Sequence, residues 1–301
     1  MDPEKNKQLG QRRNRRCKFV SGLLVAIGII AIVVPTTVVE VLKHKKLADM
    51  GPKAKVFVPL YVYPSPGAWG PLEQVVEAHP DLNFTVVINP GNGPGPNALP
   101  DANYTREIPR LSSYSNVRLI GYVATTYGTR NISLVNKDIE TYTSWPTLSN
   151  NANLSVSGIF FDETPQLFNA SHQEYYEELT ALVKQSKGLG PDNFVVHNPG
   201  SVPDSRYLAT VDSTVVFEDT YATFLQRNDD HVFTQIPNFN RSTICTIIHS
   251  IPENVQDAEL KSLVGDARKV SDEVFLTHLD TGYYSSFGPN WSGFIDLMAS
   301  D

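Results

Sequence analysis

The sequence predicts a (β/α)8 barrel over residues 54–301, preceded by one membrane-spanning helix. Eight short apolar runs rich in β-branched residues alternate with longer segments of helical character. Near-continuous apolar strands separated by helices are typical of parallel strands covered on both faces. The eight units occupy about 250 residues, the usual size of such a barrel. A doubly wound open sheet is the alternative, although it usually has fewer strands and often a phosphate-binding loop.

The elements follow one another in a regular order. The predicted strands are residues 55–63, 84–89, 117–124, 156–163, 193–198, 213–219, 243–249 and 273–278. Helix candidates between and after them are residues 72–78, 137–145, 174–185, 253–270 and 291–298. Residues 90–103, rich in Pro and Gly, have no hydrophobic period and are predicted to form a rigid surface loop. This loop lacks the Gly-Lys-Ser/Thr end of a P-loop, and its prolines lack the N–H donors that a phosphate needs.

The N-terminus differs in charge from the rest of the chain. Residues 1–18 hold seven Lys or Arg residues and two acids, a net +5, so the remainder contributes −12 to the total of −7. Residues 19–39 carry no charge and are long enough to cross a ~30 Å hydrocarbon layer. The positive-inside rule places the basic tail in the cytosol, with residues 40–53 as a stalk outside. A cleaved signal peptide is the alternative, but its apolar region is normally shorter.

Seven Asn-x-Ser/Thr sequons all follow the apolar segment, which supports a single-pass type II topology with the barrel lumenal or extracellular. They begin at Asn83, Asn103, Asn131, Asn153, Asn169, Asn240 and Asn290. Cys245 is the only cysteine of the barrel region and has no partner for an internal disulfide, so it is expected to be buried in a strand. An acidic barrel argues against nucleic acid as a partner. We expect a monomer.

Polar residues follow the predicted strands, where barrels of this class keep their active sites. In chain order they are Tyr63, Asn89, Tyr127, Asp162, Glu163, Asn198, Glu218, Asp219, His249, His278 and Asp280. Two acidic pairs, Asp162-Glu163 and Glu218-Asp219, end the fourth and sixth apolar runs. Because side chains alternate along a strand, one acid of each pair should face the site and the other the rim or helix layer.

Paired carboxylates suit the hydrolysis of a glycosidic bond. One carboxylate attacks or stabilises the sugar carbon while a second, kept protonated, donates to the leaving oxygen. Repulsion between two acids in a poorly solvated site raises the pKa of one of them. A single strand-end acid more often caps a helix or pairs with Arg or Lys. Two pairs at matching places in the fold favour catalysis.

Aromatic and histidine side chains cluster near the same strand ends. The aromatics are Tyr61, Tyr63, Trp69, Tyr122, Tyr127, Phe161, Tyr221, Tyr283, Tyr284 and Trp291. Each can belong to the core or to a sugar subsite, and Trp69 and the Tyr283-Tyr284 pair are favoured as sugar contacts. His197, His249 and His278 could hold zinc together. We expect no metal and no cofactor, because no HExxH or Cys/His ligand spacing is present, and histidines that hydrogen-bond substrate or neighbouring acids are the preferred interpretation.

Six blocks in order, VPLYVYP (58–64), VVINPGNGPG (86–95), GYVATTYG (121–128), GIFFDE (158–163), VVHNPG (195–200) and FEDTY (217–221), resemble the spherulin 4 family. Its membrane-anchored fungal members form glycoside hydrolase family 135. The resemblance covers residues 55–300 and the anchor. It implies a (β/α)8 barrel that cleaves galactosaminogalactan internally, within α-1,4-linked N-acetylgalactosamine stretches and with retention of configuration.

The family's functional acids correspond to Asp162, Glu163 and Glu218, all present here. We hypothesise that Asp162 is the nucleophile, Glu218 the acid/base, and Glu163 a substrate-orienting or pKa-tuning neighbour. Substrate contacts are predicted at Tyr63, Trp69, Asn89, Tyr127, His197, Asn198, Asp219, Tyr221, His249 and Tyr283. The alternative function is a non-catalytic cell-surface protein that binds polysaccharide on the same barrel.

Overall fold

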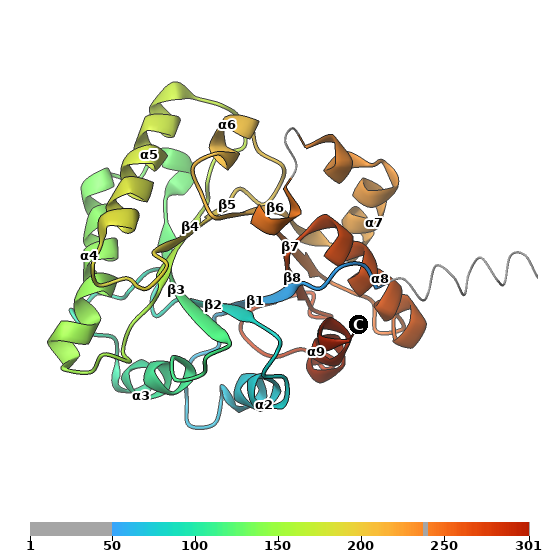
Figure 1. Ribbon diagram of the computed structural model, residues 1–301, viewed down its shortest axis with the longest axis horizontal. Coiled ribbons are helices and arrows are strands. Elements are labelled where there is room, and N and C mark those ends of the chain that lie inside the picture. Colours follow the sequence, from blue (N-terminus) through green and yellow to red (C-terminus); the bar gives the residue numbers. More distant parts are fainter. Residues whose placement is uncertain (1–49, 237–239, 301) are drawn as a thin grey trace, which may run out of the picture. The chain divides into compact units, whose positions relative to one another are not determined.

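The computed structural model describes residues 50–236 and 240–300. In this part eight parallel strands form a closed barrel in sequence order, with the helices outside it (Figure 1). The strands are β1 (Lys55–Leu60), β2 (Phe84–Ile88), β3 (Val117–Ala124), β4 (Gly158–Asp162), β5 (Phe194–Asn198), β6 (Ser213–Thr220), β7 (Ile244–His249) and β8 (Glu273–Leu276). Pairing of β1 with β8 closes the barrel. The predicted (β/α)8 barrel is confirmed.

The helices are α2 (Gly70–Ala78), α3 (Ala102–Leu111), α4 (Ile132–Ser149), α5 (Ala170–Gln185), α6 (Ser205–Leu208), α7 (Tyr221–Asp229), α8 (Asp257–Val270) and α9 (Trp291–Ala299). Three 3-10 turns, η1 (Thr126–Gly128), η2 (Val232–Gln235) and η3 (Arg241–Thr243), complete the elements. The sequence did not predict α3, α6 or α7. Asp101 starts α3 by accepting from the backbone N–H groups of Asn103 and Tyr104, so the Pro/Gly-rich loop ends there.

Two glycines allow a neighbouring strand and a tyrosine ring to approach the barrel strands closely. A Cβ on Gly158 would lie 2.0 Å from the carbonyl oxygen of Phe194, so only glycine allows β4 to begin this close to β5. A Cβ on Gly121 would lie 2.7 Å from the ring of Tyr142. That ring, from α4, donates its hydroxyl proton to the carbonyls of Ile88 and Tyr122 and so ties the helix to β2 and β3. Cys245 is fully buried in β7, as predicted.

The folded domain begins earlier than the sequence predicted. Met50 is 3% exposed, and the buried Arg268 donates to the carbonyl of Pro52 at 2.8 Å. Residues 50–53, predicted as the end of a stalk, therefore belong to the domain. The predicted tail and membrane segment (1–18 and 19–39) lie outside the described residues. Within the described part, no helix is both long and apolar enough to span a membrane.

Candidate active site

The strand ends bring Asp162 and Glu218 into one site. Asp162 ends β4 and Glu218 lies near the end of β6, with Asn198 at the end of β5 between them. The Asn198 side-chain amide donates to Asp162 Oδ1 at 2.8 Å and to Glu218 Oε2 at 2.6 Å. Because one nitrogen binds both, these oxygens are at most about 5.4 Å apart, the sum of the two distances. Both acids lie at or near the C-terminal ends of their strands.

Each acid also has its own tyrosine. Tyr122 of β3 donates its hydroxyl proton to Asp162 Oδ2 at 2.7 Å. Tyr284, on the loop after β8, donates to Glu218 Oε1 at 2.5 Å. Tyr61 packs edge-on against both rings, with centroids 5.8 and 5.4 Å away. Burial raises the pKa of all three tyrosines, so they remain protonated.

Glu218 holds its proton more readily than an ordinary glutamate. Burial raises its pKa, and the negative charge of Asp162 adds to the rise. The hydrogen bonds from Tyr284 and Asn198 act in the opposite direction because they stabilise the carboxylate. Between the two bridged acids, the geometry therefore identifies Glu218 as the candidate proton donor.

Glu163 has a different environment. Its φ of 56° lies in the left-handed region, which non-glycine residues seldom adopt. The backbone N–H of Tyr127 donates to its carbonyl at 2.6 Å. Its side chain is half-buried. Its charge contributes to the raised pKa of both Tyr122 and Tyr176.

Four predicted substrate residues lie on the loops around the site. Tyr63 and Tyr127 are 50% and 58% exposed. Asn89 accepts from the backbone N–H of Gly93 at 3.0 Å and so holds the Pro/Gly-rich loop. Tyr283 stacks on His249 with ring centroids 3.9 Å apart. Contact of these residues with a substrate remains a prediction.

Asp219, the second acid of the β6 pair, has different surroundings from Glu218. Asp219 accepts from the backbone N–H of Thr220 at 2.6 Å and lines a pocket shared with Arg227 and Phe233. Tyr221 begins α7, and burial raises its pKa. These two residues also remain predicted substrate contacts.

Two predicted contacts are wrong. His197 is 3% exposed and packs between Phe161 and Tyr176, because alternation along β5 turns Asn198 inward and His197 toward the helices. Burial lowers the pKa of His197 to about 3. Trp69 is 1% exposed and donates its indole N–H to the carbonyl of Val62 at 2.8 Å. Neither side chain can reach a polymer.

The histidines considered as metal ligands have separate environments. His197 points into the helix layer, His249 stacks on Tyr283, and Nε2 of His278 lies 3.3 Å from the carbonyl oxygen of Val255. In the described part of the chain, no group of three or more His, Cys, Asp or Glu residues is placed to hold a metal ion.

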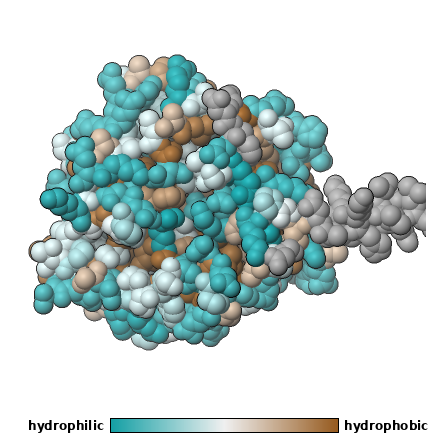
Figure 2. Space-filling view, viewed as in Figure 1, coloured by the Kyte–Doolittle hydropathy of each residue, from teal (hydrophilic) through white to brown (hydrophobic). Residues whose placement is uncertain are grey.

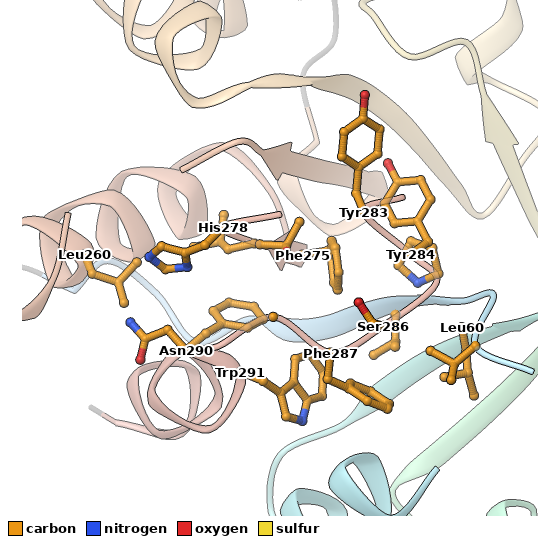
Figure 3. Close-up of a pocket in the computed structure, with 17 residues that line it drawn as sticks. Leu60, Leu260, Phe275, His278, Tyr283, Tyr284, Ser286, Phe287, Asn290 and Trp291 are labelled. Carbon is orange, nitrogen blue, oxygen red and sulfur yellow. The ribbon is translucent and has the colours of Figure 1, made fainter. Parts of the chain in front are cut away.

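Tyr284 also borders a small cavity behind the site (Figure 3). Phe275, Phe287 and Trp291 line it between β8 and α9, and Figure 3 places Tyr283 and Tyr284 together at one side of it. Its volume of about 20 Å³ is enough for about one water molecule. A sugar does not fit there. On the face viewed in Figure 2, hydrophilic residues dominate the periphery and apolar residues gather toward the middle.

The fold and the acid cluster define a (β/α)8-barrel protein with a carboxylate site at the C-terminal ends of its strands. The chain belongs to the spherulation-specific family 4 (Spherulin4), whose profile it matches over residues 55–298. It is 65% identical to Sph3 of Aspergillus clavatus, solved in complex with GalNAc, with a TM-score of 0.82 over 83% of this chain and 99% of that one.

Spherulin-4 of Physarum polycephalum is a more distant relative. It is 37% identical over 166 residues, which are 55% of this chain and 45% of that protein. The chain thus spans about half the length of this curated relative.

Proposed function

We propose that the protein is a retaining endo-acting glycoside hydrolase that cleaves α-1,4-linked N-acetylgalactosamine stretches of galactosaminogalactan. The observation that carries the proposal is the Asn198 amide bound to both Asp162 and Glu218. The GalNAc complex of the 65% identical Sph3 supports a hexosamine-containing substrate. The family resemblance supports the polymer and the linkage.

In the proposed first step, an Asp162 oxygen attacks the anomeric carbon and Glu218 gives its proton to the leaving glycosidic oxygen. Glu218 then takes a proton from water, which attacks the same carbon and releases Asp162. The raised pKa of Glu218 suits the first step because the acid must arrive protonated. Tyr122 and Asn198 orient the Asp162 carboxylate through its two oxygens.

The spacing of the acids favours retention. Inverting enzymes hold their carboxyl groups ~6.5–9.5 Å apart to admit a water molecule, whereas retaining enzymes hold them ~5–5.5 Å apart. The bridged oxygens of Asp162 and Glu218 are at most about 5.4 Å apart, which agrees with the shorter separation of retaining enzymes. Glu163, close to Tyr122, is proposed to orient the sugar or tune the site electrostatically.

Incubating residues 50–301 with galactosaminogalactan and measuring new reducing ends tests the activity. Release of oligosaccharides of several lengths supports endo cleavage, and proton NMR of the first product should detect the α-anomer. If the polymer binds without any new reducing ends, the proposal fails, and the alternative of a non-catalytic binding protein takes its place.

We further propose a type II membrane glycoprotein, anchored by residues 19–39, with the barrel lumenal or extracellular. The seven sequons after this segment support the topology. N-terminal sequencing of the protein isolated from membranes tests the anchor. A mature N-terminus near residues 45–55 would instead indicate a cleaved signal peptide.

A further inference from the structure

The loop after β3 binds the backbone of both acids that end β4. Thr125 is completely buried, and its Oγ1 lies 2.7 Å from the Asp162 carbonyl oxygen and 3.1 Å from that of Glu163. Its backbone N–H donates to the Asp162 carbonyl at 3.1 Å. Thr125 therefore contacts the main chain of Asp162 and Glu163 without touching either carboxylate.

A buried tyrosine completes this arrangement. The hydroxyl of Tyr176, from α5, lies 2.7 Å from Thr125 Oγ1. A carbonyl oxygen can only accept, so when the single proton of the Thr125 hydroxyl goes to a carbonyl of Asp162 or Glu163, the Tyr176 hydroxyl donates to Thr125. Burial raises the pKa of Tyr176, which keeps this donor protonated.

The contacts lie where the backbone leaves the strand conformation. Glu163 has a φ of 56°, a conformation that persists in non-glycine residues when surrounding contacts hold it. Beyond it, the N–H of Thr164 donates to the carbonyl of Asn198 at 3.0 Å, so the chain returns to β5 at once. An extended Glu163 would instead point its side chain to the opposite face from Asp162.

We propose that Thr125, supported by Tyr176, is a positioning residue that fixes the Asp162–Glu163 backbone so that both carboxylates serve the catalytic face. This role rests on the proposed hydrolase function. The hydrogen-bond chain from Tyr176 through Thr125 to the carbonyls at the end of β4 sets the position of the nucleophile relative to Asn198.

The test compares Thr125→Val, Thr125→Ser, Tyr176→Phe and the double variant Thr125→Val/Tyr176→Phe, each measured below its melting temperature. Thr125→Val should lower kcat on the order of 10- to 100-fold, since small misplacements of reacting groups are costly, with KM within about twofold. Thr125→Ser keeps the hydroxyl and should restore most of the rate. The double variant should be no slower than Thr125→Val, because both residues act through one chain.

Thr246→Val is the matched control. Thr246 is fully buried in β7, and its hydroxyl has no hydrogen-bond partner among the described residues, so the same substitution there should leave kcat unchanged. Wild-type kcat in Thr125→Val would overturn the proposal, as would an equal loss in Thr125→Ser or multiplied losses in the double variant.

A crystal structure of Thr125→Val tests the inference separately from activity. Glu163 should leave its left-handed conformation, or the Asp162 carboxylate should move away from Asn198. If both stay in place, the inference is wrong even when the wild type is active. If they move but the wild type cleaves no polymer, the proposed hydrolase function fails and the positioning of the two carboxylates stands.

Discussion

The hydroxyl of Tyr284 lies 2.5 Å from Oε1 of Glu218, so a loop residue after β8 binds the candidate acid on β6. The two residues are 66 positions apart in the sequence. Their contact lowers the pKa of Glu218, while burial raises it more strongly. The proton affinity of the candidate acid therefore depends on a group that lies outside the strands.

Tyr284→Phe should move the alkaline limb of kcat/KM to higher pH. Activity requires protonated Glu218, so the rate falls as pH rises through its pKa. Removing the hydrogen bond that stabilises the Glu218 carboxylate raises its pKa further. The pH at which activity falls should therefore rise as well. Tyr283→Phe is the neighbouring control. Tyr283 stacks on His249, and this substitution leaves the hydrogen bond from Tyr284 to Glu218 in place, so the limb should not move. In Tyr284→Phe, an unmoved limb, or one at lower pH, would contradict the assignment of Glu218 as acid.

Asn198→Ala should lower kcat about 10²- to 10³-fold, as loss of one preorganised donor does in other enzymes. Both acids lose their shared donor, and their mutual repulsion is no longer opposed. Asn116→Ala is the matched control because Asn116 is similarly buried but binds only main-chain carbonyls away from the acids. It should lower the melting temperature and leave the rate per folded molecule unchanged. Equal kcat losses in both variants would rule out a specific role for Asn198.

The barrel could be predicted because each strand carries its own signal. The apolar runs ending in Asp162 and Glu218 predict buried parallel strands, and the fold brings their ends to one face. Helix α3 was missed although its buried residues, Tyr104, Glu107, Ile108 and Leu111, keep helical spacing. Few of its residues are apolar, and Pro109 lies inside it. Helix α7 is short and follows β6 without a connecting loop.

The site could be predicted only where strand position decides it. The strands β4, β5 and β6 end at or near Asp162, Asn198 and Glu218. The wrong prediction for His197 could have been avoided, because side chains alternate along a strand and an inward Asn198 implies that His197 points outward to the helices. Tyr122 was noted only as one of many aromatics. It pairs with Phe160 in the β3–β4 register, two positions before Asp162, and only its long side chain brings its hydroxyl to the Asp162 carboxylate. The choice of Tyr284 over Tyr283 as the partner of Glu218 depends on loop geometry that has no local signal. Trp69 was misplaced because its Gly/Pro-rich surroundings predicted exposure.

Asp162→Asn and Glu218→Gln should respond differently to the leaving group. An aryl glycoside with an acidic phenol needs little protonation, so Glu218→Gln should keep much of its first-step rate on this substrate while losing at least about 10²-fold on the polymer. Asp162→Asn lacks the nucleophile and should be slow on both. Stopped-flow measurement of phenol release checks this. Near-normal turnover by Asp162→Asn would remove its assignment as nucleophile.

Glycan occupancy should differ among the seven sequons. Asn83, Asn131, Asn153, Asn169 and Asn240 are exposed, whereas Asn103 and Asn290 are partly buried. The Asn103 amide also donates to the Tyr63 hydroxyl at 2.8 Å, and a glycan on that nitrogen would break the contact. Mass spectrometry of glycopeptides should therefore find the exposed sites occupied more fully. High occupancy at Asn103 with low occupancy at the exposed sites would contradict this.

The stability of the domain should depend on pH through Glu218. Its pKa in the folded state is raised above the ordinary value of 4.5, so its contribution to folding is fully present below pH 4.5 and is lost as pH rises through the folded-state pKa. Glu218→Gln resembles the protonated form and avoids this loss.

The melting temperature of Glu218→Gln should therefore match the wild type near pH 4 and exceed it at pH 7 to 8. Calorimetry across this range measures the difference, with Glu253→Gln as an exposed control that should track the wild type throughout. A melting-temperature difference that shrinks as pH rises would mean that the fold stabilises the Glu218 carboxylate, and the proton-donor assignment would then lose its physical basis.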